Sequence, residues 1–303
     1  MSLDNISFVQ YINWAVMLVV FGLMGAGGLK VFKLVRLLPW APNRKTTELL
    51  REFLSTAWDR QEEFSTRIRG FFTYVVGQAR VVAEPAGVLH LFIFWGFLVL
   101  QIETIEYMIR AIFWRFHWNS IIGVTAYNAI LFVQDAIGAL VFGAIIIAAV
   151  RRFILKPKHV VVSRDAAVIL GCIGGLMLTK FVANGAEIAT FYNSLDALGH
   201  NKEWTPIALL FAQPMRDFEP ATLLGVYMAG FWIHLGIVGF FAWYIPDGKH
   251  LHLIGAMPNI FFRKLEPKGA LYPMDLEDET VESYGVAHVE ELTWKQLLDT
   301  YAC

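Results

Sequence analysis

The sequence is poor in cysteine and in charge, and both deficits narrow the class of protein. Its only two cysteines among 303 residues, Cys172 and Cys303, exclude a disulfide framework and a complete zinc or iron–sulfur site within the chain. Charged residues make up 17%, whereas ordinary soluble domains carry about 25%. The formal net charge of -1 provides no field that attracts nucleic acid. We therefore expect no nucleic-acid partner.

Apolar side chains dominate the sequence instead. Hydrophobic residues make up 56%, and the mean hydropathy is +0.51. Five stretches approach the roughly 20 apolar residues that are needed to cross the hydrocarbon core of a bilayer. They predict an all-α fold, a five-span transmembrane helix bundle surrounded by membrane lipid. The predicted spans lie near residues 11–33, 85–112, 121–150, 166–190 and 222–245.

Lysine and arginine are distributed unequally between the connections. Twenty of the 25 fall within residues 30–84, 151–165 and 246–303. Four are assigned to the opposite side: Arg110, Arg115, Lys202 and Arg216. Cytoplasmic connections carry the excess of positive charge in membrane proteins. The asymmetry predicts a multi-pass protein of a bacterial or archaeal cytoplasmic membrane, with the N-terminus outside and the C-terminus in the cytoplasm.

Two segments outside the spans have patterns of their own. In the cytoplasmic segment 34–84, apolar and charged residues alternate at helical spacing from residue 46 onward, which predicts an amphipathic helix on the inner membrane surface. Residues 249–303 are acidic, contain Pro and Gly, and end in a short helical pattern. We therefore divide the chain into a membrane domain, 1–248, and a cytoplasmic tail, 249–303.

Four histidines lie in or beside the spans, where histidine is rare and costly. If the fifth helix continues, His234 and His252 share one face, because 18 residues are a whole number of turns. His250 falls on nearly the opposite side and replaces His252 if the helix breaks at Pro246. The second and fifth spans are antiparallel, so His90 and His252 can meet at one depth near the cytoplasmic side.

Two facing imidazoles in a helix bundle form a site for a low-spin haem iron. Any haem bound there is expected to be of the non-covalent b type, because the sequence contains no CxxCH motif. No clear second ligand accompanies His234, since the second span has Leu100 ten residues after His90. Three roles stay open for His234: a ligand of a second haem, a hydrogen bond to a propionate, or a quinone site. The remaining histidines are expected at the surface: His117, His159, His200 and His288.

Ionisable residues inside spans are candidates for quinone and proton chemistry. Gln134 and Asp135 lie in the middle of the third span, and Lys180, Asn184 and Glu187 lie on one face of the fourth. Lys180 and Glu187 are either proton donors or an ion pair with each other, and we favour the ion pair.

Three other charged residues are secondary candidates. Glu103, in the outer half of the second span, is a weaker proton donor. Arg80 and Arg36, at the cytoplasmic border, are candidates for bonding haem propionates, although arginines there more often serve as positive-inside anchors.

The residues around the histidines resemble a known family. The stretch HLGIVGFFAWYIPDGKHLHLIGAMPNIFFR, which begins at His234, is similar to the membrane domain of heterodisulfide-reductase-related iron–sulfur oxidoreductases. Wider kin include the gamma subunit of respiratory nitrate reductase, a five-span cytochrome b. The resemblance implies haem ligands at His90, within AGVLHLFIFWGFLVL, and at His252, which is followed by Pro258. Leu100 stands where the two-haem relative has its outer ligand.

The tail has the most specific part of the resemblance. It reads PKGALYPMDLEDE and then TWKQLLDTYAC. In the family this phrase runs into a CxxCxxCxxxCP sequence that binds a cluster, so Cys303 corresponds to its first ligand. The resemblance implies that the [4Fe-4S] clusters belong to a missing half, because the chain is truncated or the gene is split.

The function implied by the resemblance is that of a membrane haem b subunit or domain for electron transfer. It passes electrons between a cytoplasmic iron–sulfur module, fed by electron-transfer flavoprotein, and menaquinone. It is part of a quinone-linked oxidoreductase and is not complete on its own. One haem b is expected, or two if His234 has a partner. The alternatives are a cofactor-free membrane anchor, which leaves the histidines unexplained, and a small-ion transporter, for which inverted repeats are missing.

Overall fold

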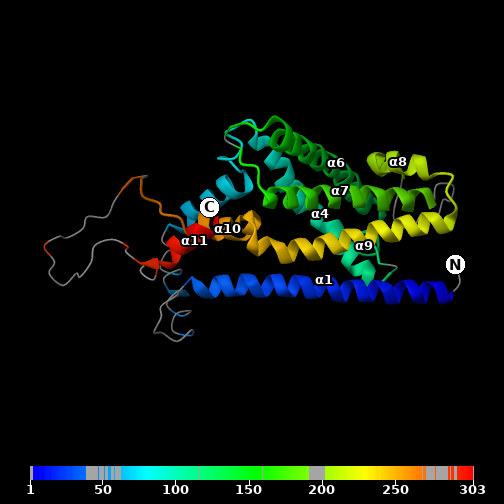
Figure 1. Cartoon of the computed structure of the whole chain (residues 1–303), viewed down its shortest axis with the longest axis horizontal. Helices are drawn as coiled ribbons and strands as arrows, with labels where there is room; N and C mark the ends of the chain where they lie inside the picture. The colour runs from blue at the N-terminus through cyan, green and yellow to red at the C-terminus, as the bar shows by residue number, and fades with distance from the viewer. Residues whose placement is uncertain are drawn as a thin grey trace. The chain divides into compact units, whose positions relative to one another are not determined.

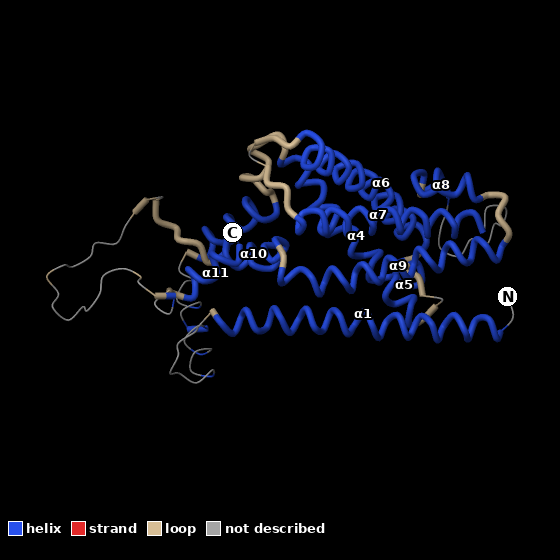
Figure 2. The backbone as a smooth tube through the Cα atoms, viewed as in Figure 1, coloured by secondary structure: helices blue, strands red, loops and turns tan. Residues whose placement is uncertain are grey.

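The computed structural model describes residues 3–38, 63–114, 116–158, 160–190, 202–267, 269–270 and 292–302, with single positions between 47 and 58 and between 277 and 289. Side chains are described from Val9 onward. All regular structure in these residues is helical, without strands (Figures 1 and 2). Several predictions fall outside them and concern His159, His200, Cys303 and most of the predicted amphipathic helix.

Among the residues that the structure describes, five helices are long and apolar enough to cross a membrane, in agreement with the predicted number of spans. Each observed apolar segment overlaps its predicted span. The five helices are α1 (Leu3–Leu37), α4 (Gly87–Ile112), α6 (Val124–Ala149), α7 (Arg164–Thr190) and α9 (Pro220–Tyr244). Shorter helices are α3 (Phe64–Phe71), α5 (Asn119–Ile122), α8 (Pro206–Ala212), α10 (His252–Phe261) and α11 (Trp294–Ala302).

Local sequence signals explain where several helices begin. Pro206 and Pro220 are the first residues of α8 and α9, a position where proline loses no intrahelical hydrogen bond. Gly123 precedes α6 with a φ of 81°, which glycine adopts without steric cost. The Ser163 hydroxyl accepts a hydrogen bond of 3.2 Å from the Ala166 amide and so caps the first turn of α7.

The chain divides into two compact units. Unit 1 comprises Met1–Gly27 and Val81–Tyr244, and it contains most of α1 with α4, α6, α7, α8 and α9. Unit 2 comprises Gly28–Arg80 and Ile245–Cys303, and it contains the end of α1 with α3, α10 and α11.

Helices of unit 1 approach each other closely at glycines. A β-carbon on Gly27 would lie 2.3 Å from the Ala242 carbonyl oxygen, and one on Gly230 would lie 3.1 Å from the Ala183 β-carbon. These positions join α1 to α9 and α7 to α9. Small residues at helix crossings provide van der Waals contact where lipid offers no hydrophobic driving force.

The apolar residues of unit 1 fall into a core and an outer surface. Phe181, Phe231 and Leu235 are completely or almost completely buried. Other large apolar side chains on the same helices are exposed, including Leu18 and Ile147. Apolar residues on both the inside and the outside of a bundle are typical of helices in lipid.

Unit 2 is held by polar contacts to helix ends and by a small apolar cluster. The Arg67 guanidinium of α3 donates hydrogen bonds of 2.9 and 3.0 Å to the carbonyls of Phe261 and Arg263, where α10 ends. Lys295 of α11 bonds to Asn259 of α10. The apolar cluster consists of Leu38, Trp294 and Leu298.

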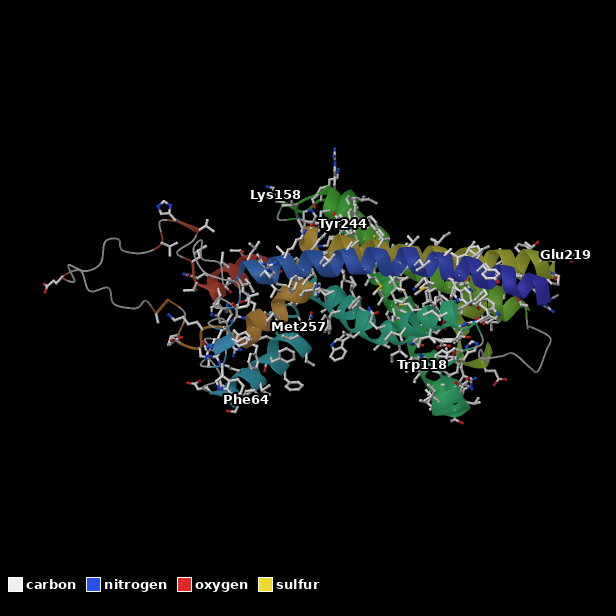
Figure 3. The ribbon with its side chains drawn as sticks, turned by 90° about the horizontal axis from the view of Figure 1, so that it is seen from below. Phe64, Trp118, Lys158, Glu219, Tyr244 and Met257 are labelled. Atoms are coloured by element: carbon white, nitrogen blue, oxygen red, sulfur yellow. The ribbon has the colours of Figure 1, made fainter. Side chains whose placement is uncertain are left out.

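The fifth spanning helix does not continue to His252, so the condition under which His234 and His252 share a helix face is not met, and the chain follows the alternative in which the helix breaks near Pro246. Glu219 precedes α9 and Tyr244 ends it, at opposite ends of the helix (Figure 3). A short 3-10 turn, an extended Gly248 and a second 3-10 turn then separate α9 from α10. Pro246 and Gly248 account for the break, because proline removes an amide donor and glycine favours non-helical backbone.

Candidate functional site

Two stripes of polar residues, one on α4 and one on α7, meet inside unit 1. Each stripe has the spacing i, i+4, i+7, which keeps its members on one helix face. All six side chains are buried. We call them the polar cluster: Glu103, Tyr107 and Arg110 of α4, with Lys180, Asn184 and Glu187 of α7.

One half of the polar cluster is centred on Glu103. Its carboxylate lies 3.1 Å from the Lys180 ammonium and accepts a hydrogen bond of 2.9 Å from the Asn184 amide. The Tyr107 hydroxyl donates to the Asn184 carbonyl oxygen at 2.7 Å. The Lys180 stem crosses α6 at Gly138, where a β-carbon would lie 3.4 Å from the Lys180 Cε atom. A charge-paired chain of proton-bearing groups thus runs from Lys180 to Tyr107.

The other half is an ion pair between Arg110 and Glu187, with a distance of 3.0 Å. The guanidinium also lies over the rings of Trp114 and Tyr227, 5.9 and 5.7 Å from their centroids. The predicted ion pair between Lys180 and Glu187 is therefore wrong, since each residue pairs across to α4 instead. Two turns separate Lys180 from Glu187 on one helix, whereas α4 presents a partner opposite each of them.

His234 of α9 lies beside the polar cluster and is 5% exposed. Its ring packs against that of Tyr107, with centroids 5.1 Å apart. The Nδ1 atom lies 3.1 Å from the Thr179 hydroxyl oxygen, which is itself 2.7 Å from the Gly175 carbonyl oxygen. The Thr179 hydroxyl donates its one hydrogen bond to the carbonyl, so the Thr179 oxygen accepts a hydrogen bond from the Nδ1–H group of His234.

The tautomer of a neutral His234 follows from this contact. With the proton on Nδ1, the Nε2 atom has a lone pair, and no hydrogen-bond partner for Nε2 is present among the described residues. Buried polar atoms are nearly always satisfied. The lone pair on Nε2 can accept a hydrogen bond from a ligand, or it can bind a metal ion.

Asp135 and Gln134 of α6 have structural partners. Both carboxylate oxygens of Asp135 accept hydrogen bonds from backbone amides, at 2.7 Å from Ile207 and 3.1 Å from Ala208. Asp135 thereby satisfies the first amides of α8. The Gln134 amide donates to the Val99 carbonyl at 3.5 Å. These contacts account for the two residues as anchors of α8 and α4.

The three histidines of the predicted haem site lie in different units. His90 is half-buried near the start of α4 in unit 1, whereas His250 and His252 belong to unit 2. The rings of His250 and His252 are 5.3 Å apart, and His252 Nδ1 donates to the Lys249 carbonyl at 2.6 Å. This bond places the proton of a neutral His252 on Nδ1 and the lone pair on Nε2.

The two candidate arginines for haem propionates lie on the surface of unit 2. Arg36 lies 5.8 Å from the Phe32 ring centroid, and Arg80 lies 5.4 Å from that of Tyr74. Both arginines are exposed. Groups of three or more metal-binding side chains are not found in the described part of the chain.

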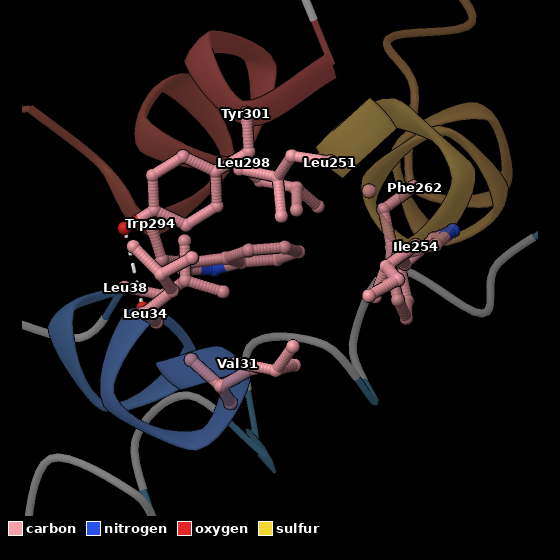
Figure 4. A pocket seen from close by; sticks show the side chains of 12 residues that line it. Val31, Leu34, Leu38, Leu251, Ile254, Phe262, Trp294, Leu298 and Tyr301 are labelled. Carbon is pink, nitrogen blue, oxygen red and sulfur yellow. Dashed lines mark hydrogen bonds between the residues drawn. The ribbon is translucent and has the colours of Figure 1, made fainter. Parts of the chain in front are cut away.

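Unit 2 also contains an apolar cavity of about 160 Å³ (Figure 4). It is lined by residues of the end of α1, of α10 and of α11. Tyr301 and Trp294 lie at its wall, and the Tyr301 hydroxyl donates to the Leu34 carbonyl at 3.2 Å. Burial raises the pKa of the Tyr301 phenol. Because the polar groups at the wall are turned away from it, this cavity suits a hydrocarbon chain rather than a polar head group.

Sequence reasoning missed several members of the site. Arg110 was counted with the outer connections, yet it is buried in α4, and His117, expected at the surface, is 8% exposed. Glu106 and Tyr107 were not singled out. The available signal was the spacing of polar residues within an otherwise apolar span, from Glu103 through Arg110.

Comparison with known proteins places the chain near two curated oxidoreductases. It is 32% identical over 244 residues to the probable iron-sulfur-binding oxidoreductase FadF of Bacillus subtilis, which covers 80% of this chain and 33% of that protein. It is 29% identical over 252 residues to the EtfAB:quinone oxidoreductase of Syntrophomonas wolfei, covering 80% of this chain and 34% of that protein.

The chain therefore spans about a third of the length of the curated relatives it matches. No protein-family model matches it. No solved structure matches it either. The two matches show that this five-helix chain is related to oxidoreductases.

Proposed function

We propose that this chain is the membrane part of an oxidoreductase that passes electrons between an iron–sulfur module and menaquinone. Electron-transfer flavoprotein feeds the iron–sulfur module. The support for these partners is the similarity to an iron-sulfur-binding oxidoreductase and to an EtfAB:quinone oxidoreductase. In this proposal the N-terminus lies outside a bacterial or archaeal cytoplasmic membrane, and the tail faces the iron–sulfur module in the cytoplasm.

The observation that carries the proposal is the polar cluster beside His234. Burying charges among apolar helices is costly, and such groups mark functional sites in membranes. The cluster combines groups that hold protons, namely Lys180, Glu103 and Tyr107, with a histidine nitrogen that has a lone pair. Quinone chemistry needs both, because a quinone that gains two electrons also takes up two protons.

The chemical roles follow from the hydrogen bonds. His234 Nε2 accepts a hydrogen bond from a quinol hydroxyl, and the bond from Nδ1 to Thr179 holds the ring in that tautomer. Lys180 and Glu103 form an ion pair, so a proton that leaves Lys180 for the oxygen of a reduced quinone leaves the lysine neutral and Glu103 as an anion, and the pair must take up a proton again before the next transfer. The six side chains of the polar cluster are buried, so bulk water does not surround the groups of this exchange.

Haem b is the second part of the proposal. His90 and His252 are its proposed axial ligands. The two residues belong to different units of the structure, so the support for this pair comes from the sequence. His252 fits the role, because its Nδ1–H is bonded to a carbonyl, as in most metal-binding histidines. His250 is the alternative ligand, because the helix breaks after Tyr244. His234 has the same pattern and fits one axial position. A bound haem supplies one-electron transfer.

Within unit 1, a second imidazole for His234 is missing among the described residues. His117 is bonded to Glu106. His90 is 13 residues before Glu103 in the sequence, which is about 20 Å along α4. Leu100 is a buried apolar residue. We therefore assign His234 to the quinone and one haem to the chain.

Binding of a quinone analogue tests the main proposal. The chain is purified in detergent and titrated with a fluorescent hydroxyquinoline N-oxide, and we expect saturable binding with one site per chain. His234→Ala and Glu103→Gln should each weaken binding by about tenfold, which corresponds to the loss of roughly one hydrogen bond to a charged or polar partner. His288→Gln, at an exposed position, is the matched control. Equal binding by all four proteins would contradict the proposal.

A reduced-minus-oxidised absorption spectrum tests the haem. We expect a haem b signal that is lost in His90→Ala and His252→Ala and kept in His234→Ala and His250→Ala. A signal that depends on His234 would move the haem to the polar cluster. A wild-type protein without a signal, prepared with haem supplied, would remove haem from the proposal while leaving the quinone site in place.

A further inference from the structure

A second buried polar group in unit 1 lies outside the polar cluster. His117, in the connection after α4, donates from Nδ1 to Glu106 Oε1 at 2.9 Å. The Tyr127 hydroxyl of α6 donates to the same oxygen at 2.8 Å. The His117 and Tyr127 rings are 6.4 Å apart. We call these three residues the Glu106 triad.

The Glu106 triad lies toward the end of unit 1 that holds the first turns of α1. Glu106 is six residues from Ile112, the last residue of α4, which is about 9 Å along the helix. Gln10 and Trp14 of α1 donate to the Ala111 and Ile112 carbonyls at that end, at 3.0 and 3.3 Å. The triad is thus closer to the end of the bundle than the half of the cluster that is centred on Glu103.

The Glu106 triad adjoins the polar cluster along α4, because Glu106 is three residues after Glu103 and residues three apart are neighbours on a helix surface. Tyr227 of α9 borders the polar cluster, where the Arg110 guanidinium lies 5.7 Å from its ring centroid. The Tyr227 hydroxyl has no hydrogen-bond partner among the described residues. Groups able to pass a proton therefore follow one another from His117 through Glu106 to Glu103 on α4.

A quinone site inside apolar helices needs such a series. Reduction of a quinone consumes two electrons, delivered singly by the reduced iron–sulfur partner, and two protons, which convert both carbonyls to hydroxyls. Lys180 and Glu103 hold one transferable proton between them, so each turnover must refill the site from water. An imidazole can take a proton at one ring nitrogen and release one from the other, which suits His117 to the bundle end.

We propose that the Glu106 triad is the proton-exchange group of this site and connects it to water at the end of unit 1 where α1 begins. This inference rests on the proposed quinone reaction. His117 exchanges the proton with water, Glu106 receives it, and Tyr127 holds the carboxylate in place. Protons move inward when quinone is reduced and outward when quinol is oxidised.

The following experiment distinguishes a proton-exchange role of the Glu106 triad from a purely structural role. The chain is reconstituted with its iron–sulfur partner in vesicles of known orientation, and a pH-sensitive dye is placed inside or outside. Menaquinone reduction is started by chemical reduction of the partner. Wild type should take protons from the compartment that holds the N-terminus. His117→Gln and Glu106→Gln should slow turnover by about tenfold or more, while quinone-analogue affinity stays unchanged.

Chemical rescue by added azide is the decisive measurement, because the protonated form of this small weak acid can carry protons past a missing relay residue. We expect azide to restore turnover in His117→Gln and to have no effect on wild type or on His288→Gln. Proton uptake from the other compartment, full turnover in both variants, or slow turnover that azide leaves unchanged would each overturn the inference. A wild type that binds no quinone analogue would instead reject the proposed function, and the inference with it.

Discussion

The two halves of α4 are built on opposite principles. Its first half, Gly87–Leu100, is apolar apart from His90 and meets α6 by close packing, because Gly96 lies against Val141. Its second half contains Glu103, Glu106, Tyr107 and Arg110, all buried and all bonded to other helices. The first half requires only close packing against α6, whereas the second half buries charged side chains among apolar helices, which lowers stability. A bundle that only anchored a soluble enzyme needs no such second half.

The largest effect should come from breaking an ion pair of the polar half. Lys180→Met keeps the volume of the side chain and leaves the Glu103 carboxylate buried without its counter-charge. Breaking a buried pair in this way costs about 3–5 kcal/mol, so we expect a strongly lowered thermal unfolding midpoint in detergent, read by tryptophan fluorescence. The double variant Lys180→Met/Glu103→Gln should recover most of the loss. A single variant as stable as wild type would show that Glu103 is not held as an anion.

A smaller loss should follow from overfilling the apolar half. A β-carbon on Gly96 would lie 2.1 Å from the Val141 Cγ2 atom, so Gly96→Leu forces α4 and α6 apart. Overpacking costs about 1–3 kcal/mol, and Val141→Ala in the same chain should relieve part of it. Quinone-analogue affinity should stay at the wild-type value. A loss of affinity equal to that of Glu103→Gln would show that the two halves act as one site.

The smallest change in stability concerns one hydroxyl of the polar half. Tyr107→Phe removes the 2.7 Å bond to Asn184 and should cost about 1 kcal/mol. Tyr11→Phe is the control, since Tyr11 is exposed on α1, and it should change stability by less than about 0.5 kcal/mol. The comparison is made by thermal unfolding of both variants under the same conditions. Equal stabilities of the two variants would mean that the Tyr107 hydroxyl contributes nothing to the cluster.

The sequence predicted the elements of the fold better than the contacts between them. Five apolar runs identify five helices, because hydrophobic length is a local property. The common face of Lys180, Asn184 and Glu187 followed from helical spacing. Their partners on α4 did not, because pairing depends on how α4 and α7 face each other. The preference for an ion pair within one helix therefore failed.

Two further differences between the sequence prediction and the structure, the break after Tyr244 and the burial of His117, depend on packing that the sequence does not show. Pro246 and Gly248 were visible as helix breakers, yet whether the backbone bends or breaks there depends on packing, and it breaks after Tyr244. His117 belongs to a connection, where most histidines are exposed. It is buried because Glu106 and Tyr127 enclose it, a contact that only the folded chain reveals.

The most direct test of the account is to label the chain with a photoreactive azidoquinone and map the labelled peptides by mass spectrometry. We expect the label on α4, α7 and α9 near Glu103, Lys180 and His234, and its loss when unlabelled menaquinone is added in excess. Label confined to the apolar cavity of unit 2, on the peptides of Leu34 and Trp294, would place the quinone there and contradict the assignment of the polar cluster.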